Sequence, residues 1–306
     1  MWNGLGVNKF RPSSHLRRTP LRATSRSTMA NITRSAKPGS QWSTNELSAY
    51  NITVRRQSVV DFFGHELPSI DHLDPNLLSS IQFNIPAPPP TGTCMQTLRF
   101  LKLLIWISGA PHMPDSDSII TDFTCSVLRV TGFELRVDGV VLIRRGLSLA
   151  ICGDINRKST PDLSLITYHV TPLILLLVQR DKPGFGSNGP EAPLIASAIA
   201  AFQNNNRNRA KMGLPALDAM TIPCITMVGT RPCFYKVPVT QHLSDCVVTG
   251  QFPLQQTVVT CCAPPSAPEG MRSVDYRHTA LRYYAAFCGV AEVCWAPILT
   301  GCPAVV

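Results

Sequence analysis

Two short apolar runs carry charged residues at the ends that would meet if the runs were neighbouring strands. Asp162 immediately precedes the first run, residues 163–166. The second run, residues 173–178, ends in a polar and charged cluster: Gln179, Arg180, Asp181 and Lys182. Two adjacent strands of this kind would bring Asp162 and Lys182 to a common edge of a sheet. Carboxylates can hold cations and cationic groups can stabilise negative charge, so this edge is the first candidate for a chemical site.

Several stretches give the chain a family resemblance. They are residues 46–52 (ELSAYNI), 151–153 (ICG), 175–179 (LLLVQ), 195–202 (IASAIAAF), 225–230 (ITMVGT) and 234–236 (FYK). From about residue 42 to residue 287 the chain resembles an expanded group of uncharacterised fungal proteins. The core of that group is in turn similar to the PD-(D/E)xK, or restriction-endonuclease-like, nucleases. The resemblance implies an α/β (mixed α+β) fold, with a central mixed sheet flanked by helices, an N-terminal arm and a C-terminal helix.

The resemblance also implies roles for the residues at the common edge. In such nucleases two carboxylates hold Mg²⁺, and a lysine stabilises the charge that develops during phosphate cleavage. Asp162 matches the first carboxylate and Lys182 matches the lysine. Members of the fungal group usually carry Glu-Asp-Lys where this chain has Arg180-Asp181-Lys182. The second metal-binding carboxylate is therefore replaced by a guanidinium, which would repel Mg²⁺ and would form an ion pair with Asp162 instead.

Two other acids are candidates for a relocated second carboxylate. Asp181 follows Arg180 directly, but side chains alternate across a strand, so only a bulge would turn Asp181 toward Asp162. Glu191 stands at the start of the next predicted helix. The fungal group often has a glutamine in the first turn of this helix, where this chain has Pro193.

These observations lead to a functional hypothesis with two alternatives. The leading hypothesis is a degenerate nuclease-like domain without a cofactor, which acts as a binding or interaction module and retains Asp162 and Lys182 as vestigial catalytic residues. The first alternative is a Mg²⁺-dependent nuclease that uses Asp162, Lys182 and either Asp181 or Glu191. The second is a defective member of an expanded group with no selected role.

A few basic residues are candidates for nucleic-acid contacts. Arg207, Arg209 and Lys211 form a basic patch without an acid between them, and Lys236 follows two aromatic residues that could stack on bases. Each has a simpler interpretation, because a solvated helix end explains the patch and an ordinary sheet with one polar face explains Lys236.

The basic character of the chain comes from its N-terminus. The formal net charge is +9, but residues 1–40 contain eight basic residues and no acid. Without these eight, 20 basic and 19 acidic residues remain, which leaves the rest of the chain near neutrality. We interpret residues 1–40 as a disordered basic tail that could bind nucleic acid loosely, with a mitochondrial transit peptide as the alternative.

The eleven cysteines are odd in number and scattered, and no C-x-x-C motif occurs. This pattern indicates reduced thiols, most of them in the core, and an intracellular location that is cytoplasmic or nuclear, or mitochondrial if the tail is a transit peptide. No apolar run reaches the ~20 residues of a membrane helix, so no membrane association is expected.

Composition and the predicted secondary structure divide the chain into four segments. After the tail we expect an N-terminal arm and Pro-rich linker (41–92), a nuclease-like α/β domain (93–290) and an irregular apolar tail without a period (291–306). Within the arm, Ser43 or Thr44 should cap a short helix. Within the domain we expect a hairpin of residues 133–137 and 140–143, turning at Asp138-Gly139. A crossover helix from residue 190 or 191 should follow the second apolar run.

Overall fold

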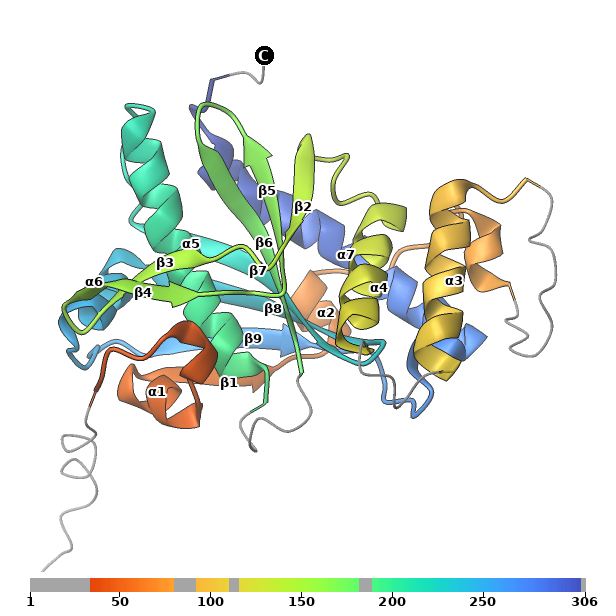
Figure 1. The fold of residues 1–306 in the computed structure, drawn as a ribbon, viewed down its shortest axis with the longest axis horizontal. Coiled ribbons are helices and arrows are strands. Elements are labelled where there is room, and N and C mark those ends of the chain that lie inside the picture. Colours follow the sequence, from red (N-terminus) through yellow and green to blue (C-terminus); the bar gives the residue numbers. More distant parts are fainter. Residues whose placement is uncertain (1–33, 80–91, 110–115, 182–188, 304–306) are drawn as a thin grey trace, which may run out of the picture. The chain divides into compact units, whose positions relative to one another are not determined.

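The computed structural model describes residues 34–79, 92–109, 116–181 and 189–303 of the chain. Among these residues, one sheet has the strand order β1-β9-β8-β7-β6-β5-β2, and β3 and β4 form a separate antiparallel pair (Figure 1). The strands are β1 (Ile52–Arg56), β2 (Gly139–Ile143), β3 (Leu147–Ile151), β4 (Asp154–Ser159), β5 (Leu163–Tyr168), β6 (Pro172–Arg180), β7 (Ala219–Val228), β8 (Arg231–Thr240) and β9 (Thr257–Cys262). The sheet contains both parallel and antiparallel pairs. The predicted mixed α/β fold is confirmed.

Helices flank this sheet. They are α1 (Thr44–Ala49), α2 (Val59–Phe63), α3 (Met95–Gly109), α4 (Ser116–Val130), α5 (Glu191–Lys211), α6 (Gln241–Thr249) and α7 (Val274–Leu299), with short 3-10 turns at Gly39–Gln41, Pro75–Leu78 and Gly270–Arg272. Helices α5 and α7 both pack on the central strands and lie on opposite faces of the sheet (Figure 1). A strand covered on both faces must be apolar throughout, which explains the unbroken run at residues 173–178.

The crossover predicted after the second apolar run is present. Strand β6 pairs in parallel with β7, and α5 connects them. Parallel neighbours need such a long connection, whereas the antiparallel pairs β7–β8 and β8–β9 do not. The helix runs as far as Lys211, because its amide side chains bond to the sheet: Asn205 donates to the carbonyl of Ile174 and accepts from its N–H, both at 2.8 Å.

An aromatic cluster fills the core between the sheet and α7. Phe287 of α7 lies 4.9 Å from Phe234 of β8 and 6.3 Å from Phe62 of α2, measured between ring centroids. Phe133, in the turn after α4, is 6.5 Å from Phe287. Each of these four rings is at most 1% exposed. The cluster therefore joins segments that lie more than 200 residues apart in the sequence.

The segment expected to be an N-terminal arm belongs to the main sheet. Strand β1 pairs in parallel with β9, with Ile52 opposite Thr257 and Arg56 opposite Cys261. The described residues from Arg34 onward belong to one compact unit. The short helix α1 is capped by Ser43, as the sequence predicts.

Two predictions of secondary structure are wrong. Residues 133–137 are not a strand: they form a series of turns, and β2 pairs with β5 instead. Residues 291–299 are not irregular, because α7 continues to Leu299. Trp295 is 1% exposed, and its indole N–H donates to the carbonyl of Leu175 at 2.7 Å, so the sheet holds this end of the helix.

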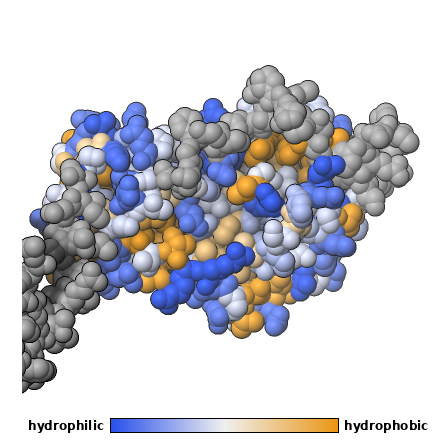
Figure 2. Space-filling model, turned by 90° about the horizontal axis from the view of Figure 1, so that it is seen from below, coloured by the Kyte–Doolittle hydropathy of each residue, from blue (hydrophilic) through white to orange (hydrophobic). Residues whose placement is uncertain are grey.

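Several features of the sequence lie outside the described residues. These are the N-terminal tail up to residue 33, the proline run at residues 86–90, Lys182 and the last three residues. Among the helices that the structure describes, none has both the length and the apolarity needed to span a membrane. On the face shown in Figure 2, hydrophobic residues form separate patches bordered by hydrophilic ones.

Candidate functional site

The two strands that carry the candidate site are neighbours. Strands β5 and β6 pair antiparallel, with Leu163 opposite Val178. This register brings Asp162, which immediately precedes β5, to the end of β6 at Gln179 and Arg180. The prediction that Asp162 meets the charged end of the second run is confirmed for Arg180. Lys182 lies outside the described residues, so its predicted approach to Asp162 stays a prediction.

The carboxylate of Asp162 is held by residues 179 and 180. Its Oδ1 accepts from Nη2 of Arg180 at 3.1 Å, and the two side chains are 2% and 1% exposed. Its Oδ2 accepts from the backbone N–H of Arg180 and from Nε2 of Gln179, both at 2.8 Å. The predicted ion pair between Asp162 and Arg180 is therefore present, and at least three donors bind the two carboxylate oxygens.

This arrangement does not fit a Mg²⁺ site. A metal ion would have to compete with the donors that the carboxylate of Asp162 already accepts from, at Gln179 and Arg180. A second carboxylate would add negative charge, but Arg180 supplies a permanent positive charge at 3.1 Å. Within the described residues, the charge of Asp162 is therefore balanced by Arg180.

Neither candidate for the relocated carboxylate joins this network in the structure. Asp181 is exposed while Arg180 is buried, as the alternation of side chains predicts, and the N–H of Asp181 donates to the carbonyl of Met227 at 2.9 Å. Glu191 accepts a hydrogen bond from the hydroxyl of Tyr235 at 2.8 Å. Burial, the charge of Glu191 and a nearby cysteine raise the pKa of Tyr235, so its hydroxyl stays protonated and keeps donating.

The described part of the chain also lacks a cluster of metal ligands elsewhere. Among residues 34–79, 92–109, 116–181 and 189–303 there is no group of three or more His, Cys, Asp or Glu side chains that could hold a metal ion. Pro193 lies in the first turn of α5, and its carbonyl accepts from the hydroxyl of Ser197 at 3.0 Å. This turn adds no polar side chain to the site.

The basic patch at the end of α5 divides into two exposed residues and one buried residue. Arg207 and Lys211 are exposed. Arg209 is 3% exposed and donates to three backbone carbonyls, those of Pro215 (3.1 Å), Ile298 (2.7 Å) and Thr300 (3.1 Å). The prediction that Arg209 contacts nucleic acid is wrong, because its guanidinium joins the C-terminal ends of α5 and α7.

Lys236 is also held by the protein. Its ammonium group donates to the carbonyl of Phe62 at 2.7 Å and lies 4.5 Å from the centre of the Phe62 ring. Burial lowers the pKa of Lys236. Its predicted contact with nucleic acid stays a prediction, and within the protein its positive charge stabilises the packing of α2 on the sheet.

Besides Arg180, the structure brings basic residues toward Asp162 that the sequence did not point to. Arg144 and Arg145 follow β2, and the N–H of Arg144 donates to the carbonyl of Asp162 at 2.9 Å. The side chain of Lys158, in β4, lies close to this turn. A Cβ atom built on Gly146 would lie 3.7 Å from it. Arg144 and Lys158 are exposed, and Arg145 is partly exposed. The pairing of β2 with β5 brings Arg144 and Arg145 to the site.

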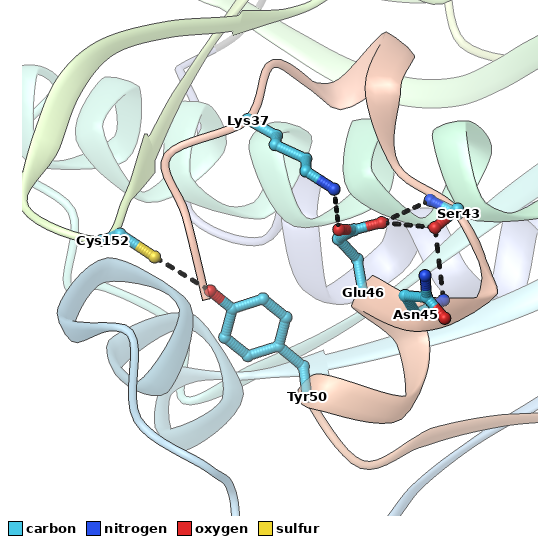
Figure 3. A network of polar contacts seen from close by, with 6 residues as sticks. All are labelled: Lys37, Ser43, Asn45, Glu46, Tyr50 and Cys152. Atoms are coloured by element: carbon cyan, nitrogen blue, oxygen red, sulfur yellow. Dashed lines mark hydrogen bonds and ion pairs between the residues drawn. The ribbon is translucent and has the colours of Figure 1, made fainter. Parts of the chain in front are cut away.

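A second polar network ties residues near the N-terminus to the core (Figure 3). Glu46 accepts from the hydroxyl and the N–H of Ser43, both at 2.7 Å, and forms an ion pair with Lys37. The hydroxyl of Tyr50 lies 3.3 Å from the sulfur of Cys152. Lys37 belongs to the segment that the sequence predicts to be a disordered tail, so that tail ends earlier than residue 40. This network is structural, since each polar group is used within the protein.

Comparisons with known proteins do not assign the chain to a family. No protein-family model matches the chain, and no curated protein sequence matches it either.

Proposed function

We propose that residues 34–306 are a nuclease-like domain that has lost metal-dependent cleavage and acts as a binding or interaction module. The observation that supports this proposal is the state of Asp162, whose two oxygens accept from Arg180, from Gln179 and from the backbone. A metal-dependent nuclease would need these oxygens for the cation. Arg180 takes the position of the second carboxylate and neutralises the first.

The proposal is tested by titrating the full-length protein with Mg²⁺ in a calorimeter and assaying cleavage of DNA and RNA. We expect no specific binding of Mg²⁺ and no cleavage above that of a matched Asp162→Asn variant, which keeps the size of the side chain. Stoichiometric binding of Mg²⁺, together with cleavage that Asp162→Asn abolishes, would overturn the proposal in favour of a nuclease with a relocated carboxylate.

The variant Arg180→Glu sharpens the test. It restores the acid that the fungal group carries at this position and removes the guanidinium from Asp162. Two adjacent buried carboxylates repel each other, so the variant should be less stable than the wild type without metal. If the edge retains the geometry of a nuclease, Mg²⁺ should then raise its melting temperature, whereas Mg²⁺ should leave the melting temperature of the wild type unchanged.

The partner that the site supports best is a polyanion such as DNA or RNA. Arg144, Arg145 and Lys158 lie beside the neutralised edge and present positive charge to solvent. Fluorescence anisotropy with labelled oligonucleotides at low and high salt measures this binding. We expect Arg144→Ala combined with Arg145→Ala to weaken it more than Arg207→Ala combined with Lys211→Ala. An equal effect of the two double variants would contradict this assignment of the surface.

A further inference from the structure

Two cysteines lie on adjacent strands in the half of the sheet away from Asp162. Cys233 is in β8, and Cys261 is in β9. Tyr235 pairs directly opposite Cys261 in the antiparallel ladder between these strands. Since side chains alternate along a strand, Cys233 and Tyr235 point to the same face, and Cys261 shares it. The two thiols are therefore diagonal neighbours on one face of the sheet.

The surroundings of this pair are polar and partly open to solvent. Cys233 is partly exposed, whereas Cys261 is 7% exposed. Arg56 of β1 pairs opposite Cys261, and Thr226 of β7 pairs opposite Cys233. A thiol that solvent reaches, next to a second thiol and near a guanidinium, has the environment of a reactive cysteine.

Solvent access distinguishes the two sulfurs, because Cys233 is partly exposed and Cys261 is 7% exposed. The neighbouring Cys261 thiol lowers the pKa of Cys233 below its ordinary value, and Tyr235 and Arg56 act in the same direction, whereas burial and the negative charge of Glu191 oppose it. The neighbouring Cys233 and burial raise the pKa of Cys261. Burial likewise raises the pKa of Cys125 and Cys288, which are core residues. Cys233 thus differs in kind from the buried thiols.

We propose that Cys233 and Cys261 form a peroxide-reactive thiol pair, in which Cys233 attacks and Cys261 resolves. The Cys233 thiolate attacks one oxygen of hydrogen peroxide, the O–O bond breaks, and hydroxide leaves and takes a proton to become water. The sulfur of Cys261, after loss of its proton, then attacks the sulfur of the Cys233 sulfenic acid. This step forms the disulfide and releases the second water. Two thiols lose two electrons, and one peroxide gains them.

The position of Cys233 in the ladder makes closure possible. Diagonal neighbours have Cα atoms about 7–8 Å apart, and a disulfide spans up to about 6.8 Å, so the strands must approach slightly. The last pair between β8 and β9 is Phe234 with Cys262, so Cys233 stands just beyond the end of the ladder. Its backbone is paired on the other side with Thr226 of β7, so closure requires β9 and the side chain of Cys233 to make most of this approach.

The experiment treats the full-length, reduced protein with a small excess of hydrogen peroxide. Remaining thiols are blocked with iodoacetamide, and peptides are mapped by mass spectrometry without reduction. We expect a Cys233–Cys261 cross-linked peptide that dithiothreitol removes. In a Cys261→Ser variant the cross-link should be lost, and the sulfenic acid on Cys233 should accumulate as a dimedone adduct.

Cys262→Ser is the matched control, because Cys262 is the chain neighbour of Cys261, points to the opposite face and is 3% exposed. This variant should form the Cys233–Cys261 disulfide at the same rate as the wild type. The proposal is overturned if peroxide oxidises Cys233 no faster than the exposed Cys94, or if Cys261→Ser leaves the oxidation products unchanged. A thermal melt of each variant before oxidation shows that a lost product does not come from misfolding.

Discussion

Two ion pairs in this protein use the same chemistry in opposite surroundings. Asp162 and Arg180 are 2% and 1% exposed at the ends of β5 and β6, whereas Glu46 and Lys37 are 13% and 39% exposed near the N-terminus (Figure 3). Water cannot replace a missing partner in the first pair, but it can in the second. The comparison teaches that only the first pair commits its carboxylate to the fold, because the free energy of an unpartnered charge depends on access to solvent.

Removing the cation from the buried pair should have the largest effect. In Arg180→Met, Asp162 keeps its bonds to Gln179 and the backbone but loses the opposite charge. We expect the free energy of unfolding to fall by about 3–5 kcal/mol at pH 7, because the buried carboxylate loses the guanidinium that it pairs with. Urea denaturation followed by circular dichroism measures this change.

The double variant Arg180→Met with Asp162→Asn is the control for this prediction. It removes both charges and should recover most of the lost stability, since a neutral amide is far cheaper to bury than a carboxylate. A loss below about 1 kcal/mol in the single variant would show that water reaches Asp162, and the contrast with Glu46 would fail.

Arg209 offers an intermediate case, a buried cation bound to carbonyl groups. In Arg209→Met, the carbonyls of Pro215, Ile298 and Thr300 lose their charged donor. We expect a loss of about 2–3 kcal/mol in the free energy of unfolding. The matched change Arg207→Met, two residues away on the exposed side of α5, should cost no more than about 0.5 kcal/mol. Equal effects in the two variants would contradict a structural role for Arg209.

The exposed pair should show the smallest effect, and one that depends on pH. Burial tends to raise the pKa of Glu46, but the hydrogen bonds from Lys37 and Ser43 outweigh it, and the pKa lies below its ordinary value of 4.5. A carboxylate with a lowered folded pKa stabilises the fold above the unfolded pKa, and this contribution is lost as the pH falls through the folded pKa.

Glu46→Gln tests this dependence, since the amide can still accept the capping hydrogen bonds. We expect the variant to lose about 0.5–1 kcal/mol at pH 7. The difference from the wild type should shrink as the pH falls below 4.5. Thermal melts at pH 7, 5 and 3 measure it, and a difference that grows toward pH 3 would be the contrary result.

Local patterns in the sequence were sufficient for part of the fold. The capping residue Ser43, the apolar run of β6 and the crossover helix α5 could all be predicted, because caps, burial and periodicity depend on neighbours in the chain. The prediction of a hairpin strand at residues 133–137 was wrong, because a contact with a distant part of the chain decides the structure there. Phe133 is fully buried against Phe287, a residue of α7, and that distant contact outweighs the local strand pattern.

At the candidate site, too, some features follow from local sequence and others from contacts between distant residues. The sequence by itself determined that Asp162 immediately precedes one strand, that Arg180 ends its neighbour, and that Asp181 faces away from Arg180, since these follow from residue order and alternation. Only the tertiary structure decided that Gln179 completes the network, that Arg209 and Lys236 serve the fold, and that Cys233 meets Cys261. Each of these contacts joins side chains through strand register or helix packing, and such pairings are chosen by the burial of the whole core and not by any local stretch of residues.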